Sequence, residues 1–141
     1  MFRQQMDDSK TEYKIITQEI NQGIYTLNLL SNGVVQVVFD SALNQIEKEH
    51  LVALKHSLGR LGEGKKLRIY FNIAAFLNIS AEGREYSASP DASNFTLANA
   101  VLVDSLAKKI AFNFFLNINK PPTPTKAFSK QEEAFEWLLS V

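Results

Sequence analysis

Alternating hydrophobic and polar residues in the N-terminal third of the chain predict a series of short strands. Residues 13–19 are rich in β-branched side chains, and Asn21-Gln22-Gly23 then predicts a turn. The segments 24–31 and 34–39 alternate on either side of Asn32-Gly33, a pair that tolerates the positive φ of a type I′ turn. We therefore expect a β-hairpin preceded by one further strand.

The middle of the chain switches between helical and strand periodicity. Apolar residues recur at helical spacing from Leu43 to Leu61, after Asp40 or Ser41 as candidate N-caps. The segment 67–73 alternates, whereas a central strand covered on both sides would be apolar throughout. We therefore expect helices to cover only one face of the sheet. A short polar helix over 81–89 follows.

The C-terminal third carries the clearest pattern. A strand is expected over 97–103 and a short extended piece over 125–128, with three prolines between them ending a helix. That helix is capped by Asp104 or Ser105, and its predicted buried stripe is Leu106, Ile110, Phe114 and Ile118. The final helix is predicted to start with a capping box from Ser129 to Glu132 and to bury Ala134, Phe135, Trp137 and Leu138.

The resulting element order is β-β-β-α-β-α-β-α-β-α, an α/β protein with a mixed sheet, an N-terminal antiparallel hairpin and helices mainly on one face. At 141 residues the chain is long enough for one domain with a substantial core. We expect that domain over residues 12–141, with a frayed N-terminus over residues 1–11.

The C-terminal residues resemble a known family. The segment from Pro124 to Leu138, with Pro-Thr-Lys-x-Phe followed by Glu-Glu-Ala-x-x-Trp-Leu, is similar to small bacterial STAS-like proteins. These SpoIIAA-like proteins are related to the anti-sigma-factor antagonists. The upstream pattern from Ala100 to Ser105 also matches, and the resemblance covers about residues 12–139. It implies a mixed sheet with helices mainly on one face.

The resemblance also points to candidate regulatory residues. Phosphorylatable antagonists carry an Asp-Ser-Ser-Gly-like turn, and Ser80 stands near the modified position, although the aspartate and the second serine are absent. The other interpretation of Ser80 is a helix N-cap. In a STAS-like fold the following helix belongs to the usual partner surface, which here would comprise Glu82, Arg84, Glu85 and Tyr86.

The helix over 106–118 has more aromatic residues than one buried stripe requires. Phe112, Phe115 and Leu116 lie outside the predicted stripe. A helix that is apolar around most of its girth is either buried or in contact with a partner. Two interpretations follow for these three residues: self-association as a homodimer, or burial beneath the final helix.

The composition argues against several classes of protein. Lys and Arg total 15, as do Asp and Glu, so the net charge is zero and the Lys108-Lys109 pair does not make a nucleic-acid-binding stripe. The chain has no cysteine, which excludes disulfides and thiolate chemistry and fits a cytoplasmic protein. No secretory signal and no apolar run long enough for a transmembrane segment is found.

The sequence offers no set of residues suited to catalysis. His50 and His56 are six residues apart and lie on different faces of one predicted helix, so His50 is expected to be a satisfied, half-buried residue near Glu47. The glycines at 59, 62 and 64 follow a helix, whereas a phosphate-binding loop follows a strand. We therefore expect no enzyme activity, no metal and no cofactor.

Two functions remain as alternatives. The first is a regulatory or protein-interaction module that binds another protein or itself. The second is a carrier of a small apolar or lipid-like ligand, because 10 phenylalanines could line a pocket. A carrier should have a closed apolar cavity of several hundred Å³ between sheet and helices, whereas an interaction module should have a packed core and an exposed patch.

Overall fold

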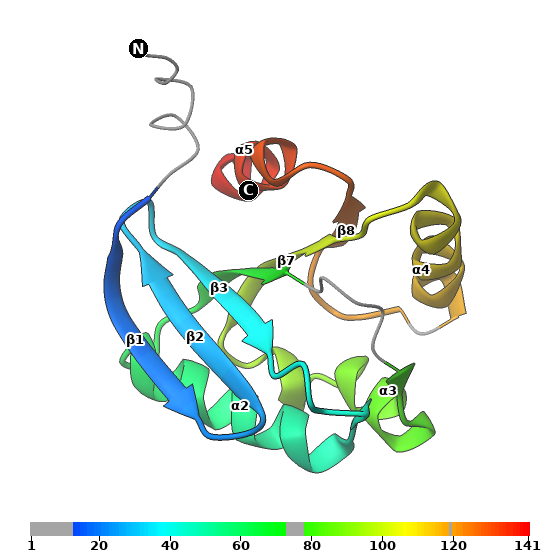
Figure 1. Ribbon diagram of the computed structural model, residues 1–141, viewed down its shortest axis with the longest axis horizontal. Coiled ribbons are helices and arrows are strands. Elements are labelled where there is room, and N and C mark those ends of the chain that lie inside the picture. The colour runs from blue at the N-terminus through cyan, green and yellow to red at the C-terminus, as the bar shows by residue number, and fades with distance from the viewer. Residues whose placement is uncertain (1–12, 73–77, 119) are drawn as a thin grey trace.

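The computed structural model describes residues 13–72, 78–118 and 120–141. Within these ranges six strands form one mixed sheet in the order β1-β2-β3-β5-β7-β8 (Figure 1). The first three strands are antiparallel, and β3, β5, β7 and β8 run parallel to one another. The strands are β1 (Ile15–Asn21), β2 (Tyr25–Leu30), β3 (Val34–Phe39), β5 (Leu67–Asn72), β7 (Thr96–Leu102) and β8 (Thr125–Phe128). The predicted fold class is confirmed.

Helices and two very short strands complete the described structure. The helices are α2 (Lys48–Leu61), α3 (Ala81–Ser87), α4 (Leu106–Ile118) and α5 (Gln131–Ser140), with a 3-10 turn η1 (Asp91–Ser93). The short strands β4 (Gln45–Ile46) and β6 (Asn78–Ile79) pair in parallel as a second sheet. These two strands could not be predicted from the sequence, because two residues are too few to show a period.

Helix α2 covers one face of the large sheet and forms the larger part of the core. Its residues Leu54 and Leu58 are buried against the face of β2, β3 and β5 that carries Leu27, Val37 and Ile69. The inner side of α4 lies toward this same face, next to Val101 and Val103. Helices therefore lie mainly on one face, as predicted.

The opposite face is covered as well, by α5. Ala134, Phe135 and Leu138 pack against a second buried cluster that contains Tyr70 of β5 and Ala98 of β7. In Figure 1, α5 lies across the sheet from α2. The expectation that helices cover only one face is therefore wrong. The alternation of apolar and polar residues in β5 was misleading, because a tyrosine counts as polar by its hydroxyl although its ring can be buried.

The β2–β3 hairpin is correct in its position and wrong in its turn type. Strand β2 ends at Leu30 and β3 begins at Val34, which leaves three residues in the loop. Gly33 has a positive φ of 89°, whereas Asn32 does not, so the loop is not the predicted type I′ turn. The Asn32 side chain instead accepts a hydrogen bond from the Val34 amide at 3.0 Å. A three-residue loop with glycine at the positive φ is the next most common solution.

The predicted start of α2 is also wrong. The helix begins at Lys48, and Asp40 accepts a hydrogen bond from the Ala42 amide in a turn instead of capping the helix. A capping box between Glu47 and His50 starts the helix, with the Glu47 amide donating to His50 Nδ1 at 2.9 Å. His50 is thus the satisfied, half-buried residue that was predicted. The glycine run ends the helix, as expected.

The start of α5 differs from its prediction by one residue. Lys130 is the N-cap and makes no side-chain capping bond, so the capping box predicted at Ser129 is not formed. Strand β8 pairs in parallel with β7 at the edge of the sheet, which confirms the short extended segment predicted before this helix. The frayed N-terminus predicted for residues 1–11 lies outside the described residues.

Candidate functional site

Helix α4 begins at a capped and charge-paired turn. The Lys108 amide donates to Ser105 Oγ at 3.1 Å, and Lys108 Nζ lies 2.8 Å from the Asp104 carboxylate. The hydrogen bond from Lys108 lowers the pKa of Asp104. The predicted capping by this pair of residues is confirmed for Ser105. The first turn of the helix is thereby fixed at the end of β7.

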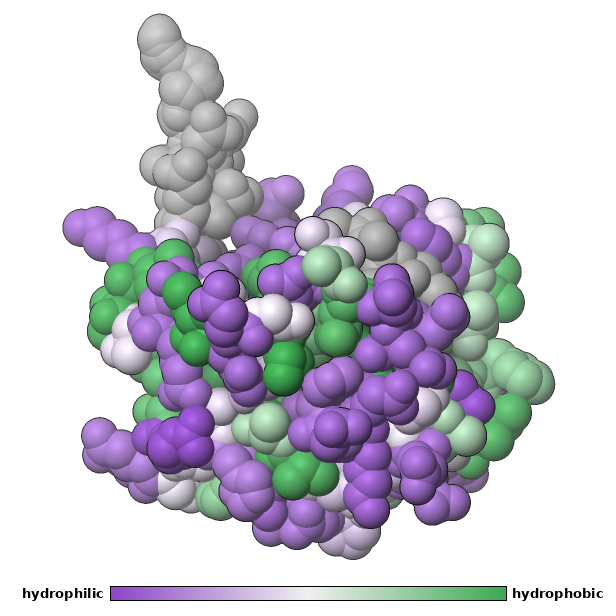
Figure 2. All heavy atoms as spheres, turned by 60° about the horizontal axis from the view of Figure 1, so that its bottom comes forward, coloured by the Kyte–Doolittle hydropathy of each residue, from purple (hydrophilic) through white to green (hydrophobic). Residues whose placement is uncertain are grey.

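The outer side of α4 exposes the stripe that was predicted to be buried. Its four residues recur every fourth position, so they form one row along the helix. The exposed fractions are 73% for Leu106, 60% for Ile110, 64% for Phe114 and 64% for Ile118. Figure 2 shows hydrophobic colour along the right-hand edge of the molecule, on the side where α4 lies in Figure 1. We call these four residues the outer stripe.

The inner side of α4 carries the three residues predicted for self-association. Phe112, Phe115 and Leu116 are half-buried, and Phe112 packs against a cluster that contains Val101 and Val103. Self-association through these three residues stays a prediction. Burial beneath the final helix is wrong, because α5 lies on the opposite face of the sheet. The two sides of α4 are exchanged relative to the sequence analysis.

One signal in the sequence indicates the correct side. Asn113 and Asn117 are one helical turn apart, and both are exposed on the side of Leu106 and Ile110. Between Ile110 and Ile118 the helix has no charged residue, so these two amides are the strongest polar groups available to favour water. The apolar count alone does not distinguish the two sides.

A cavity of about 150 Å³ lies between the inner side of α4 and the sheet. The sheet contributes Phe39 and Phe71, whose rings are stacked with centroids 6.3 Å apart. Helix α4 contributes Phe112 and Phe115, whose centroids are 5.8 Å apart. Leucines of α2 also line it. The cavity is mostly apolar and partly open to solvent.

A second cavity of about 200 Å³ lies beside the first, also under α4. Four residues line both cavities and therefore lie between them: Ile79, Val101, Phe112 and Phe115. Lys108 and Arg84 add basic groups to the second cavity only. The inner side of α4 is thus incompletely packed along its length.

Besides Ser87, Ser93 and Thr96, which also line it, longer polar side chains reach the first cavity at two places. Asn99 of β7 lies next to β8, and its Nδ2 is 3.4 Å from Thr123 Oγ1 and 3.3 Å from Thr125 Oγ1. Both distances are long for hydrogen bonds. At the other place, Lys55 of α2 lines the cavity with only 14% of its side chain exposed.

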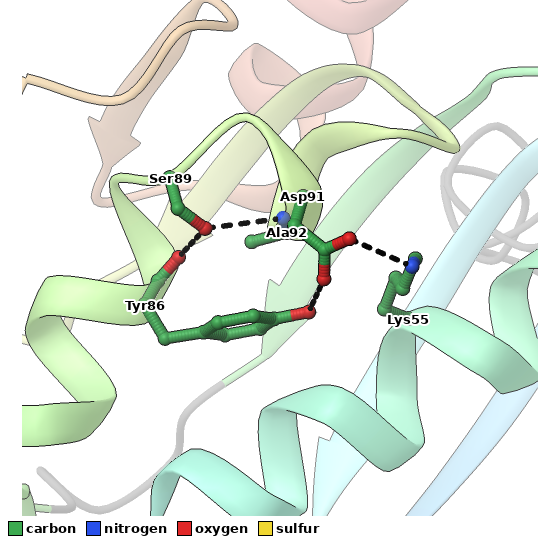
Figure 3. Close-up of polar contacts among 5 residues, drawn as sticks. All are labelled: Lys55, Tyr86, Ser89, Asp91 and Ala92. Carbon is green, nitrogen blue, oxygen red and sulfur yellow. Dashed lines mark hydrogen bonds and ion pairs between the residues drawn. The ribbon is translucent and has the colours of Figure 1, made fainter.

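Asp91 holds the polar corner beside this cavity (Figure 3). One carboxylate oxygen accepts from the Tyr86 hydroxyl at 2.6 Å, and the other lies 3.1 Å from Lys55 Nζ. Ser89 Oγ donates to the Tyr86 carbonyl at 2.6 Å and accepts from the Ala92 amide at 3.4 Å. These bonds join α2, α3 and η1.

The electrostatics of this corner follow from its contacts. The hydrogen bond from Tyr86, followed by the one from Lys55, lowers the pKa of Asp91. Burial raises the pKa of Tyr86, and the hydrogen bond to Asp91 raises it further. At neutral pH the carboxylate is therefore ionised and the phenol is protonated. Because Asp91 neutralises Lys55, this wall of the cavity has no net charge.

The predicted partner surface on α3 is only partly at the surface. Glu82, Arg84 and Glu85 are exposed, whereas Tyr86 is 9% exposed and its hydroxyl is engaged by Asp91. The assignment of Tyr86 to an exposed surface is therefore wrong, because its ring packs inward from the short helix. The other three residues remain a predicted surface.

Ser80 is confirmed as the N-cap of α3. Its Oγ accepts a hydrogen bond from the Gly83 amide at 3.0 Å. Phosphorylation of Ser80 stays a prediction, which mass spectrometry after incubation with a cognate kinase would test. Within the described ranges no three His, Asp or Glu side chains gather as a metal site. None of the described helices has the length and apolar character to cross a membrane.

The fold places the chain among known structures. It is similar to an uncharacterised protein of the DUF3478 family with a SpoIIAA-like fold from Shewanella loihica, with a TM-score of 0.53. The identity is 14%, over 90% of this chain and 95% of that chain. This level of similarity establishes the fold alone: the chain has a SpoIIAA-like α/β fold, as the sequence resemblance implied.

The family follows from the sequence match. Residues 28–141 match the family model described as Domain of unknown function (DUF7793), and the chain belongs to this family. A protein of unknown function from an Arthrobacter species has a TM-score of 0.31 and 21% identity over 82% of this chain and 99% of that chain. This TM-score is too low to support a common fold. No protein of curated function matches.

Proposed function

We propose that this chain is a non-enzymatic interaction module that pairs with a second copy of itself through the outer stripe of α4. The observation that carries the proposal is the exposure of four large apolar side chains in one row of a described helix. Isolated exposed apolar residues are ordinary, whereas a contiguous row of this kind marks a contact surface. A cytoplasmic location, expected from the lack of cysteine, stays a prediction.

The area of the outer stripe supports a second copy as the occupant. Its four residues expose on the order of 500 Å². Two copies facing each other would bury on the order of 1,000 Å² in total, at the lower limit for a specific interface. A reversible dimer is therefore expected, rather than an obligate one.

The geometry and charge of the outer stripe also suit an identical partner. Side chains four residues apart form a ridge, and two such ridges interdigitate when helices cross at about −50°. The stripe is flanked by the neutral Asn113 and Asn117, and Lys108 is paired with Asp104 on the same helix. The whole chain has zero net charge, so two copies do not repel each other.

The alternative, a carrier of a lipid-like ligand, is less well supported. Such a carrier needs a closed apolar cavity of several hundred Å³. The two cavities under α4 measure about 150 and 200 Å³, and both are partly open. The pairing of a small cavity with a large exposed stripe favours the interaction module.

Sedimentation velocity over a range of protein concentrations tests the proposal. We expect the wild-type chain to dimerise with a Kd on the order of 10 µM. Phe114→Glu should weaken the dimer at least about tenfold, because it places two like charges at the centre of the contact. Ile20→Glu on β1 is the matched control: this residue is 61% exposed, on a different element, and its change should leave the dimer intact.

Two outcomes would refute the proposed dimer. One is a wild-type chain that remains monomeric at about 100 µM. The other is a dimer that survives Phe114→Glu and is lost in Ile20→Glu, which would place the interface on the β1 edge. Circular dichroism of each variant would verify that the fold is retained.

A further inference from the structure

We propose that the 150 Å³ cavity beneath α4 is a binding site for a neutral, single-ring aromatic ligand that carries one hydrogen-bond acceptor. The proposed dimer uses the outer side of α4, whereas this cavity uses the inner side. The inference therefore goes beyond the docking function and does not depend on it.

The size of the cavity sets the size of the ligand. A protein cavity of about 150 Å³ lined by aliphatic and aromatic residues stays dry and accommodates benzene. The cavity in this chain has the same volume and a mostly apolar lining, but it is partly open and also has polar residues in its wall. A fatty-acyl chain or a fused multi-ring compound would not fit, whereas one six-membered ring would.

The walls favour an aromatic ring over an aliphatic one. Phe39 and Phe71 present a pair of rings from the sheet, and Phe112 and Phe115 present a pair from α4. A ring placed between two such pairs can make edge-to-face contacts with both. These contacts add about 0.5–1.5 kcal/mol per pair beyond the burial of area.

Asn99 specifies the polar group. Its amide Nδ2 reaches two threonine hydroxyls at 3.3 and 3.4 Å, distances at which a hydrogen bond is weak. A ligand oxygen in the cavity could accept from the same amide at a normal distance. Because Asn99 Nδ2 is an N–H donor, a ligand group that binds to it must be a hydrogen-bond acceptor.

The charge balance of the lining favours a neutral ligand. Lys55 is the basic residue of this cavity among the described residues, and its ammonium group is paired with Asp91 at 3.1 Å. An anionic ligand would have to compete with that carboxylate and lose its own hydration. A cationic ligand that paired with Asp91 would leave the Lys55 ammonium group without its counter-ion, and the two positive charges would repel each other.

Helix α4 covers one side of the cavity, which is partly open, and is loosely attached. None of its described side chains is buried, and it contacts chiefly β8 at the edge of the sheet. Ligand entry therefore requires the displacement of few packed groups.

Titration with phenol, benzene and benzoate, followed by methyl and amide NMR shifts of the full chain, tests the inference. Phenol has the ring, the acceptor oxygen and no charge at pH 7. We expect saturable binding with a Kd on the order of 1 mM or below, and shifts centred on Val101 and Leu116. Benzene should bind more weakly than phenol, and benzoate should not bind.

Two substitutions locate the site and its polar group. Ala92→Leu adds bulk to a residue that lines the cavity, and should weaken phenol binding at least about tenfold. Ala42→Leu makes the same change at an exposed turn and should have no effect. Asn99→Ala should reduce phenol affinity to the level of benzene and leave benzene affinity unchanged.

Three results would overturn the inference. The first is the absence of saturable binding of phenol and benzene up to about 10 mM. The other two are benzoate binding as tight as that of phenol, and NMR shifts centred away from the cavity. The shift map of the wild-type chain decides the last point even if Ala92→Leu does not fold. Repeating the titration with Phe114→Glu separates this site from the dimer, because that variant should bind phenol normally.

Discussion

Helices α4 and α5 are neighbours in the chain and relate to the sheet in opposite ways. In α5 three apolar residues are sealed against the sheet, with exposed fractions of 0% for Ala134, 4% for Phe135 and 0% for Leu138, and only Leu139 is well exposed, at 47%. In α4 the outer stripe is 60–73% exposed, and no described side chain of the helix is buried. Helix α5 therefore stabilises the fold, whereas α4 presents an apolar surface to solvent.

The difference lies in how the polar residues are placed. Glu132, Glu133 and Glu136 occupy the outer side of α5 and are exposed, so only one side of that helix can be buried. Helix α4 has no charged residue from Ile110 to Ile118. Its orientation is therefore set by its connections to β7 and β8. In either orientation, apolar side chains would remain on its outer side.

The largest expected effect is on the stability contributed by α5. Phe135→Ala should lower the free energy of unfolding by about 3–5 kcal/mol, because it removes a buried ring that contacts Tyr70 at a centroid distance of 4.9 Å. Phe114→Ala on α4 should change it by less than about 0.5 kcal/mol. Urea denaturation of the monomeric protein measures both. Equal losses in the two variants would contradict the distinction between these helices.

Trp137 refines this prediction. From the sequence it was expected to be part of the inner face of α5, at a cost of roughly 3–5 kcal/mol for Trp137→Ala if the ring were buried. The ring is only half-buried and packs against Phe128 at a centroid distance of 5.6 Å. The loss should therefore fall below that of Phe135→Ala in the same experiment.

The next effect concerns the end of α5. Arg68 of β5 donates from Nε to the Leu138 carbonyl at 2.7 Å and from a terminal nitrogen to the Val141 carbonyl. A cation here satisfies free carbonyls and complements the helix dipole. Arg68→Met keeps much of the stem and should cost about 1.5–3 kcal/mol.

Arg60→Met is the control for Arg68→Met. Arg60 forms a surface ion pair with Glu19 at 2.8 Å, and 65% of its side chain is exposed. Its loss should cost at most about 1 kcal/mol. If both arginine variants lost the same free energy, or if added salt removed the effect at Arg68, the cap would be no stronger than a surface pair.

The comparison of the two helices also explains what could be predicted from the sequence. Strands with clean alternation, the position of the hairpin and the Ser80 cap are local, and each was identified correctly. The start of α2 was not, because Leu43 and Ile46 mimic helical spacing, whereas Ile46 pairs with Ile79 far along the chain. Such non-local pairing leaves no mark on the local pattern.

The candidate site was harder to predict for the same reason. The inner residues of α4 were singled out as more than one stripe needs, but the cavity that they line could not be predicted. The acidic residue that fixes the corner, Asp91, belongs to no motif that the sequence singles out. Its partners Lys55 and Tyr86 come from two other elements, so only the folded chain brings the three together.

The smallest effect, and the sharpest test of the seal made by α5, concerns two buried tyrosines. The Tyr70 ring lies under α5, and its hydroxyl is buried without a hydrogen-bond partner among the described residues. The Tyr25 hydroxyl, under α2, bonds to Ser57 Oγ at 2.6 Å. Tyr70→Phe should therefore raise the free energy of unfolding by about 1 kcal/mol, and Tyr25→Phe should lower it by about 1 kcal/mol.

A pH series tests the same seal independently. Burial raises the pKa of Tyr70 to about 12, whereas the unfolded tyrosine ionises near its ordinary value of about 10. Between these values the unfolded chain releases a proton that the folded chain retains, so stability falls as the pH rises through this window. The fall should be smaller in Tyr70→Phe than in the wild-type chain. An identical fall in both would mean that water reaches this hydroxyl and that α5 does not close over it.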